Sequence, residues 1–293
     1  MMMAPADAAL LDAIRALRWP ARKRAPAGLV GEHLSRVLGG TAEFTEYRVY
    51  RQGDDPGRID WKLVARSDRV FIRLSRERTM LPTTLVVDAS ASLAYPESTL
   101  EKWQYARLVA IGLASAAHRG GDPVGLIVGT AEGPKRLPLR TRQGVVHDIA
   151  RVLRLVVPAG NSPLAPVLVT HLARGRVAIV SDFLGDDADD LLAASARLCA
   201  AGREVHAIHI VHPAELDPPR RTALAMDPEH TELRRPLTEG SRRHYAGAFG
   251  AWRAALASAW RGAGATYAEV VTREPVAHAV RRIVTPAVSA SAR

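Results

Sequence analysis

Short apolar runs alternate with longer amphipathic segments over most of the chain, and this alternation limits the fold more than any other feature. The apolar runs are typical of buried strands and cover residues 83–87, 124–128, 177–180, 204–211 and 266–271. The segments between them carry apolar residues at helical spacing. Strands that alternate with helices of this length predict an α/β fold, a doubly wound, mostly parallel sheet flanked by helices. Residues 135–139 are expected to add a hairpin strand.

The 293 residues divide into two predicted regions. Residues 79–293 contain the strand-and-helix alternation, and residues 1–78 form an N-terminal extension. Within that extension, residues 7–17 have helical spacing, with Asp7 as a candidate N-cap. A long C-terminal helix carries an aromatic stripe that is expected to face the core. The stripe contains Tyr245, Phe249, Trp252, Leu256 and Trp260.

The composition narrows the class of protein. Cys199 is the only cysteine, so no intramolecular disulfide can form, which fits the reducing cytoplasm. We find no signal peptide pattern and no apolar run near the ~20 residues that span a bilayer. The net charge is +10, and 36 of the 40 basic residues are arginine. Because these are spread along the chain with few aromatics among them, they argue against a dedicated nucleic-acid site, and membrane contact would be peripheral at most.

Polar side chains cluster where two of the predicted strands end. Asp88, Ser90 and Ser92 follow the strand at 83–87, and Asp182 follows the strand at 177–180. Ser162 lies in a loop between them. Ligands of open parallel sheets bind beyond the carboxyl ends of the strands, so these oxygen donors are expected to converge. A set of carboxylates and hydroxyls suits Mg²⁺ or Mn²⁺ rather than Zn²⁺. The alternative is that Asp88 caps the following turn and the serines satisfy backbone groups.

This constellation resembles the metal-ion-dependent adhesion site (MIDAS) of von Willebrand factor A domains. That motif has D-x-S-x-S on a first loop, Thr on a second and Asp on a third. Asp88, Ser90 and Ser92 match the first loop, and Asp182 matches the third. Ser162 stands where Thr is usual and keeps the hydroxyl. The resemblance implies that an acidic residue of a bound protein completes the metal's coordination.

Residues 39–66 resemble the signature of the DUF58 family, and the resemblance extends over about residues 39–260. The matching motifs are Glu43-Phe44, Arg48-Val49-Tyr50, Gly53-Asp54-Asp55, Arg58-Ile59-Asp60-Trp61 and Ala65-Arg66. The resemblance implies a von Willebrand factor A-like domain and partnership with a MoxR-type AAA+ ATPase in chaperone-like maturation of protein complexes, without enzymatic activity. His212 stands where the family often has Asp.

The charged signature segment has two interpretations. Its arginines and carboxylates could pair internally, with Ile59 and Trp61 partly buried. Otherwise they form a docking surface for the ATPase or for a client protein. The candidate partner-binding residues are Arg48, Asp54, Asp55, Arg58, Asp60, Trp61 and Arg66.

Two other function classes remain as alternatives. The first is a metal-dependent hydrolase that uses Asp88 and Asp182, although Ser90 occupies the place of the second acid of a haloacid-dehalogenase-type phosphatase. The sequence also lacks the phosphate loop of an ATPase. The second is a basic scaffold that binds nucleic acid or a membrane surface. A zinc site is disfavoured because His206 and His209 would point to opposite faces of one strand.

Overall fold

The structure is a computed structural model that describes residues 4–21, 30–52, 54, 56–67, 69–171, 175–219, 224–226, 232 and 234–285. Its centre is a six-stranded sheet with the strand order β10-β7-β6-β3-β4-β5. The strands are β3 (Thr83–Asp88), β4 (Val124–Gly129), β5 (Lys135–Arg140), β6 (Arg176–Ser181), β7 (Glu204–Val211) and β10 (Thr266–Val271). Only β5 at one edge runs antiparallel. The predicted doubly wound, mostly parallel sheet is therefore confirmed.

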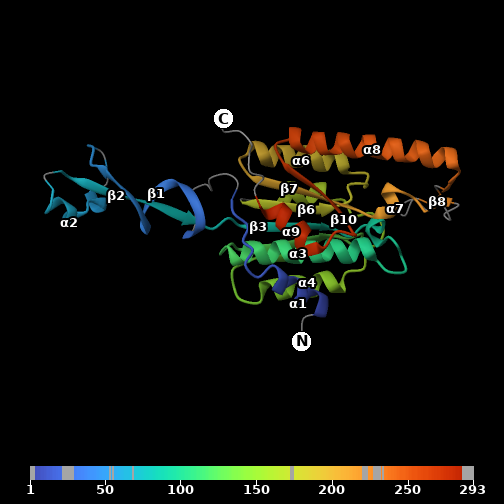
Figure 1. The fold of residues 1–293 in the computed structure, drawn as a ribbon, viewed down its shortest axis with the longest axis horizontal. Helices are drawn as coiled ribbons and strands as arrows, with labels where there is room; N and C mark the ends of the chain where they lie inside the picture. The colour runs from blue at the N-terminus through green and yellow to red at the C-terminus, as the bar shows by residue number, and fades with distance from the viewer. Residues whose placement is uncertain are drawn as a thin grey trace.

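Helices cover both faces of this sheet (Figure 1). The two apolar clusters assign the helices to the faces. One face carries α1 (Pro5–Ala13), α3 (Glu101–Arg119), α4 (Val145–Leu155) and α9 (Val276–Val284), and the other carries α5 (Ala165–His171), α6 (Ala188–Ala200) and α8 (Glu239–Gly262). Side chains alternate along a strand, so Leu85 and Val87 pack into the first layer while Val86 packs into the second. Every residue of β3 is buried, which explains the apolar run at the centre of the strand.

The aromatic stripe of α8 faces the sheet but is buried at one end only. Trp260 is 1 % exposed and belongs to the second apolar layer, which Leu256 also contacts. Tyr245, Phe249 and Trp252 are half-buried and stack on one another. The stripe is therefore a packing face, as its spacing predicts, with a partly exposed N-terminal half.

The N-terminal helix docks on the domain through Asp7, and the prediction that Asp7 is an N-cap is wrong. Helix α1 begins at Pro5, so Asp7 lies inside its first turn and is fully buried. Its carboxylate accepts hydrogen bonds from Arg107 at 2.8 Å and from Arg154 at 2.9 Å. Two guanidinium groups from α3 and α4 therefore compensate one buried charge.

The signature segment lies within a separate two-stranded sheet of β1 (Val30–Val49) and β2 (Phe71–Thr79), with η1 (Pro56–Arg58) and α2 (Trp61–Val64) between the two strands. Arg48 pairs with Asp54 at 2.7 Å, and Asp60 caps α2 and accepts a hydrogen bond from the Tyr47 hydroxyl. The prediction that Trp61 is partly buried is wrong, because Trp61 is 67 % exposed. Arg66 is exposed, while Asp55 and the side chain of Arg58 lie outside the described residues. The domain boundary at residues 78 and 79 stays a prediction.

The remaining elements are short: η2 (Ala91–Ala94), α7 (Pro213–Leu216), β8 (Leu224–Met226) and β9 (Arg234–Pro236). On β7, His206 contacts Trp19 whereas His209 contacts Phe183 and Trp252, so the two imidazoles do lie on opposite faces. Among the described residues, no helix combines the length and apolar character that a membrane span requires.

Candidate metal centre

The Asp88 carboxylate lies at the carboxyl end of the central strand β3 and is 5 % exposed. Its Oδ1 accepts a hydrogen bond from the backbone N–H of Ser90 at 2.8 Å, so Asp88 does cap the following turn. Its Oδ2 accepts a hydrogen bond from the Ser181 hydroxyl at 2.6 Å. Both bonds leave lone pairs free, because each carboxylate oxygen can accept more than one bond. The turn role and a metal-binding role are therefore compatible.

Asp182 follows β6, the parallel neighbour of β3, and is 1 % exposed. Because carboxyl ends of parallel strands meet at one edge of a sheet, Asp182 comes close to Asp88 and the two carboxylates repel. The hydroxyls of Ser90 and Ser92 lie 3.0 Å apart, and Ser92 also hydrogen-bonds to Asp182. Four of the five predicted donors thus form one connected group.

Ser162, the fifth donor, is buried on the loop between α4 and α5. Its loop is tied to the Asp88 loop by a hydrogen bond from the Ala91 N–H to the Gly160 carbonyl at 2.9 Å. Gly129, which pairs with Asp88 across β3 and β4, makes room for Ser162, because a Cβ at Gly129 would lie 2.5 Å from the Ser162 Oγ. That Oγ is buried without a hydrogen-bond partner among the described residues. Burying a hydroxyl without a hydrogen-bond partner costs free energy, so the Ser162 hydroxyl is a candidate to bind a ligand.

Lys102 belongs to the same polar cluster and was not predicted from the sequence. It lies in the first turn of α3, is fully buried, and donates hydrogen bonds to Asp182 at 2.6 Å and to Glu215 at 2.7 Å. The available signal was its rarity, because Lys102 is one of only four lysines in a chain with 36 arginines. Because the chain otherwise uses arginine, a buried lysine in α3 indicates that this position specifically requires lysine.

Glu215 connects the centre to α7. One carboxylate oxygen accepts from Lys102, and the other accepts from the His212 backbone N–H at 2.6 Å. The His212 side chain in turn accepts from the Ala214 N–H, which completes a capping box at the start of α7. His212 therefore caps α7, at the position where the family often has Asp.

The charges explain the pKa values of the cluster. Burial raises the pKa of Asp88 to about 6, the negative charge of Asp182 adds to this rise, and the hydrogen bonds from Ser181 and Ser90 oppose it. Burial also raises the pKa of Asp182, but the charge and hydrogen bond of Lys102 outweigh burial and hold this pKa below its ordinary value. Burial lowers the pKa of Lys102, yet the charges of Asp182 and Glu215 leave it above its ordinary value. Lys102 therefore neutralises Asp182, and within the described ranges no basic side chain forms an ion pair with Asp88.

The chemistry of this donor set fits a divalent cation. Three carboxylates and one ammonium, those of Asp88, Asp182, Glu215 and Lys102, leave two uncompensated negative charges. The hydroxyls of Ser90, Ser92 and Ser162 are further oxygen donors at the same sheet edge. The described residues contain no group of three or more His, Cys, Asp or Glu side chains arranged for a metal. A cation here would be held by the carboxylates of Asp88 and Asp182 and by the three hydroxyls, which are the oxygen donors that a hard divalent ion prefers.

The fold and this polar cluster define a doubly wound α/β protein with a candidate cation centre at the carboxyl edge of its sheet. The family described as "Protein of unknown function DUF58" matches residues 46–253. The chain belongs to the DUF58 family. It is 31 % identical over 268 residues to the uncharacterized protein Rv1480 of Mycobacterium tuberculosis and to Mb1516 of Mycobacterium bovis. Each alignment covers 88 % of this chain and 84 % of the relative.

Solved structures resemble the chain more distantly. An aerotolerance-related membrane protein from Bacteroides fragilis is 14 % identical, with a TM-score of 0.44 over 69 % of this chain and 96 % of that chain. BatB from Bacteroides thetaiotaomicron is 11 % identical, with a TM-score of 0.41 over 69 % and 98 % of the two chains. The SpRpn10 VWA domain is 13 % identical, with a TM-score of 0.39 over 71 % and 96 %.

Proposed function

We propose that this protein is a non-enzymatic, metal-dependent interaction protein that works with a MoxR-type AAA+ ATPase in the maturation of other protein complexes. In this proposal Asp88, Ser90, Ser92, Ser162 and Asp182 hold Mg²⁺ or Mn²⁺. The cation, when bound, supplies a coordination position to which a partner's Asp or Glu side chain binds. The site is cytoplasmic in this proposal, and the expected partners are the ATPase and a client protein.

The observation that carries the proposal is the state of the Asp88 carboxylate. It is buried, its pKa is raised to about 6, and Lys102 serves Asp182 instead. A buried carboxylate that is still charged at neutral pH is expensive unless a cation compensates it. The Ser162 hydroxyl, which has no hydrogen-bond partner in the described part of the chain, is a second unsatisfied group in the same cluster. One bound divalent cation would satisfy both groups.

The chain's own residues prepare the centre for a protein ligand. Ser181 and the Ser90 N–H hold the Asp88 carboxylate in place, and the Leu184 N–H and Lys102 hold Asp182. Two carboxylates and three hydroxyls leave room in an octahedral shell for water or for an incoming carboxylate. The exposed loops at the sheet edge, including Asn161 and Leu184, are the surface that such a partner would meet.

Assignment of the ATPase as partner rests on the family resemblance of residues 39–66. The exposed Trp61 adds physical support for a docking role of this segment, because a large exposed aromatic side chain is typical of interaction surfaces. The Arg48–Asp54 pair and the Asp60 cap serve the local structure. Within the segment, Trp61 and Arg66 are therefore the contact residues that we propose.

Binding of a MoxR-type ATPase from the same organism to the tagged protein tests the proposal. The measurement is made with Mg²⁺, with EDTA, and with an Asp88→Asn variant. Asp12→Asn is the matched control, because the Asp12 side chain is 80 % exposed. We expect retention of the ATPase that requires both Mg²⁺ and Asp88. Retention that neither EDTA nor Asp88→Asn changes would overturn the metal-dependent part and place binding on another surface.

The hydrolase alternative is separated by a turnover assay. The wild-type protein with Mg²⁺ or Mn²⁺ is incubated with generic phosphoesters, beside Asp88→Asn and Asp12→Asn. The proposal expects no turnover above the Asp88→Asn background. Turnover that disappears only in Asp88→Asn would instead identify a metal-dependent hydrolase.

A further inference from the structure

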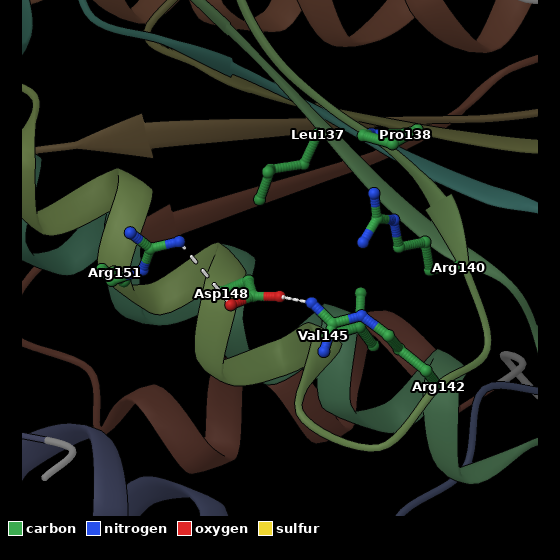
Figure 2. Close-up of a pocket in the computed structure, with 7 residues that line it drawn as sticks. All are labelled: Leu137, Pro138, Arg140, Arg142, Val145, Asp148 and Arg151. Carbon is green, nitrogen blue, oxygen red and sulfur yellow. Dashed lines mark hydrogen bonds and ion pairs between the residues drawn. The ribbon is translucent and has the colours of Figure 1, made fainter. Parts of the chain in front are cut away.

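A hollow of about 250 Å³ lies between the edge strand β5 and the N-terminal half of α4 (Figure 2). Leu137, Pro138 and Val145 provide its apolar wall. Val145 is almost fully buried and Leu137 is half-buried, so the wall belongs to the packed domain. The hollow thus has a firm apolar side against which a ligand could pack.

The charged side of the hollow is dominated by arginine. Arg140, Arg142 and Arg151 point toward it with Asp148 among them (Figure 2). Arg142 is hydrogen-bonded to Asp148, and Arg151 lies 3.7 Å from the same carboxylate. Three guanidinium groups and one carboxylate give the lining a net charge of two positive units.

The single carboxylate of Asp148 is too little to neutralise the three guanidinium groups of the lining. Arg142 and Arg151 share this carboxylate, while the side chain of Arg140 has no hydrogen-bond or ion-pair partner among the described residues. The chain from residue 135 to residue 155 carries six Lys or Arg residues and no acid other than Asp148. Arginine binds carboxylates in a bidentate, planar arrangement, so the hollow complements an anionic side chain.

The hollow is distinct from the cation centre. Arg140 pairs with Val124 at the start of β4, whereas Asp88 pairs with Gly129 at the end of the same strand. The hollow therefore lies toward the opposite end of β4 from Asp88, and the two sites can be tested separately.

We propose that this hollow binds an acidic segment of a protein partner, with Asp or Glu side chains on Arg140 and Arg151 and a neighbouring apolar side chain against Leu137. The apolar wall beside the arginines favours a peptide over a nucleic-acid backbone, which has phosphates but no aliphatic group to fill it. Recognition occurs through side chains in this proposal, because Pro138 in the edge strand β5 has no N–H to offer to an added strand.

The test is fluorescence anisotropy with a labelled twelve-residue peptide of alternating Glu and Leu, in EDTA so that the cation centre does not contribute. The full-length protein is compared with Arg140→Glu/Arg151→Glu and with Arg235→Glu/Arg243→Glu, a control with the same net charge on exposed residues of β9 and α8. Asp148→Asn is a third variant, because it removes the carboxylate that competes for two arginines. Thermal melts verify that each variant is folded.

We expect the Arg140/Arg151 reversal to weaken binding at least tenfold more than the control reversal, and Asp148→Asn to tighten binding several-fold. Equal losses in the two reversals, or no tightening in Asp148→Asn, would overturn the proposal. A twelve-nucleotide single strand is the competing ligand. If it binds the wild-type protein more tightly than the peptide does, and if Arg140→Glu/Arg151→Glu abolishes this binding, the proposal is overturned and the hollow is assigned to nucleic acid.

Discussion

The Lys102 ammonium lies 2.6 Å from Asp182 Oδ2, so a buried cation of the protein already occupies one side of the candidate metal centre. This pair joins α3 to the end of β6 and leaves Asp88 as the uncompensated carboxylate. A metal at this centre would therefore share the Asp182 carboxylate with the Lys102 ammonium.

Lys102→Met should destabilise the metal-free protein by about 3 kcal/mol, because Asp182 and Glu215 would lose their buried cation. The same change should increase the affinity for Mg²⁺, because a fixed positive charge leaves the centre. Thermal melts with EDTA and with Mg²⁺ measure both effects, and Mg²⁺ should raise the melting temperature of Lys102→Met more than that of wild type. Lys135→Met, at an exposed lysine of β5, is the control. A Lys102→Met variant as stable as this control would contradict the description of the ion pair.

Ser162→Ala should leave the free energy of unfolding within about 0.5 kcal/mol of wild type, because the Ser162 hydroxyl has no hydrogen-bond partner to lose among the residues that the structure describes. If Ser162 is a metal ligand, the affinity for Mg²⁺ should fall about tenfold, as expected for one lost polar contact. Ser195→Ala is a matched control, since Ser195 on α6 is also buried and unpartnered among the described residues. Equal Mg²⁺ affinities in the two variants would remove Ser162 from the ligand set.

His209 should make the protein less stable in acid. Burial lowers the pKa of His209 from 6.5 to about 4, against the opposing charges of Asp182 and Glu269. The unfolded chain therefore binds a proton that the folded one does not, so this contribution is complete above pH 6.5 and is lost as the pH falls toward 4. Asp88, with its raised pKa, acts in the opposite direction, so the comparison must be with a His209 variant.

Urea unfolding of wild type and His209→Gln at pH 7 and pH 5 isolates this contribution. Gln can still hydrogen-bond to Tyr267, whose hydroxyl lies 2.6 Å from His209 Nδ1. Relative to the variant, wild type should lose about 2 kcal/mol between pH 7 and pH 5. Parallel pH profiles for the two proteins would show that His209 is not held neutral by burial.

Asp7→Asn should cost about 3 kcal/mol, because it leaves Arg107 buried beside a neutral partner. Asp12→Asn, on the exposed side of the same helix, should change stability by less than about 0.5 kcal/mol. Urea unfolding of both variants measures the difference. Equal stabilities would mean that α1 is not anchored to the domain through Asp7.

Local patterns predicted the sheet because its central strands contain short apolar runs between helical segments. Asp88 and Asp182 stood at strand ends that parallel topology brings together. Lys102 was not predictable in the same way. Its partners Asp182 and Glu215 are 80 and 113 residues away, and helical spacing at residues 100–117 indicates only a buried helix. Asp7 illustrates the same limit, because its position suits a cap while its partners, Arg107 and Arg154, lie in distant helices. The prediction for Trp61 was wrong for another reason, since an aromatic residue in a charged run can be buried or exposed.

Titration calorimetry of Mg²⁺ and Mn²⁺ into wild type and Asp88→Asn tests the central claim most directly. Because the charged form of Asp88 is disfavoured in the metal-free protein, Asp88→Asn should melt at or above the temperature of metal-free wild type, so lost binding will not reflect lost folding. We predict saturable binding of one cation to wild type and none to Asp88→Asn. Equal binding by the two folded proteins, or no binding by either, would contradict a metal centre at Asp88.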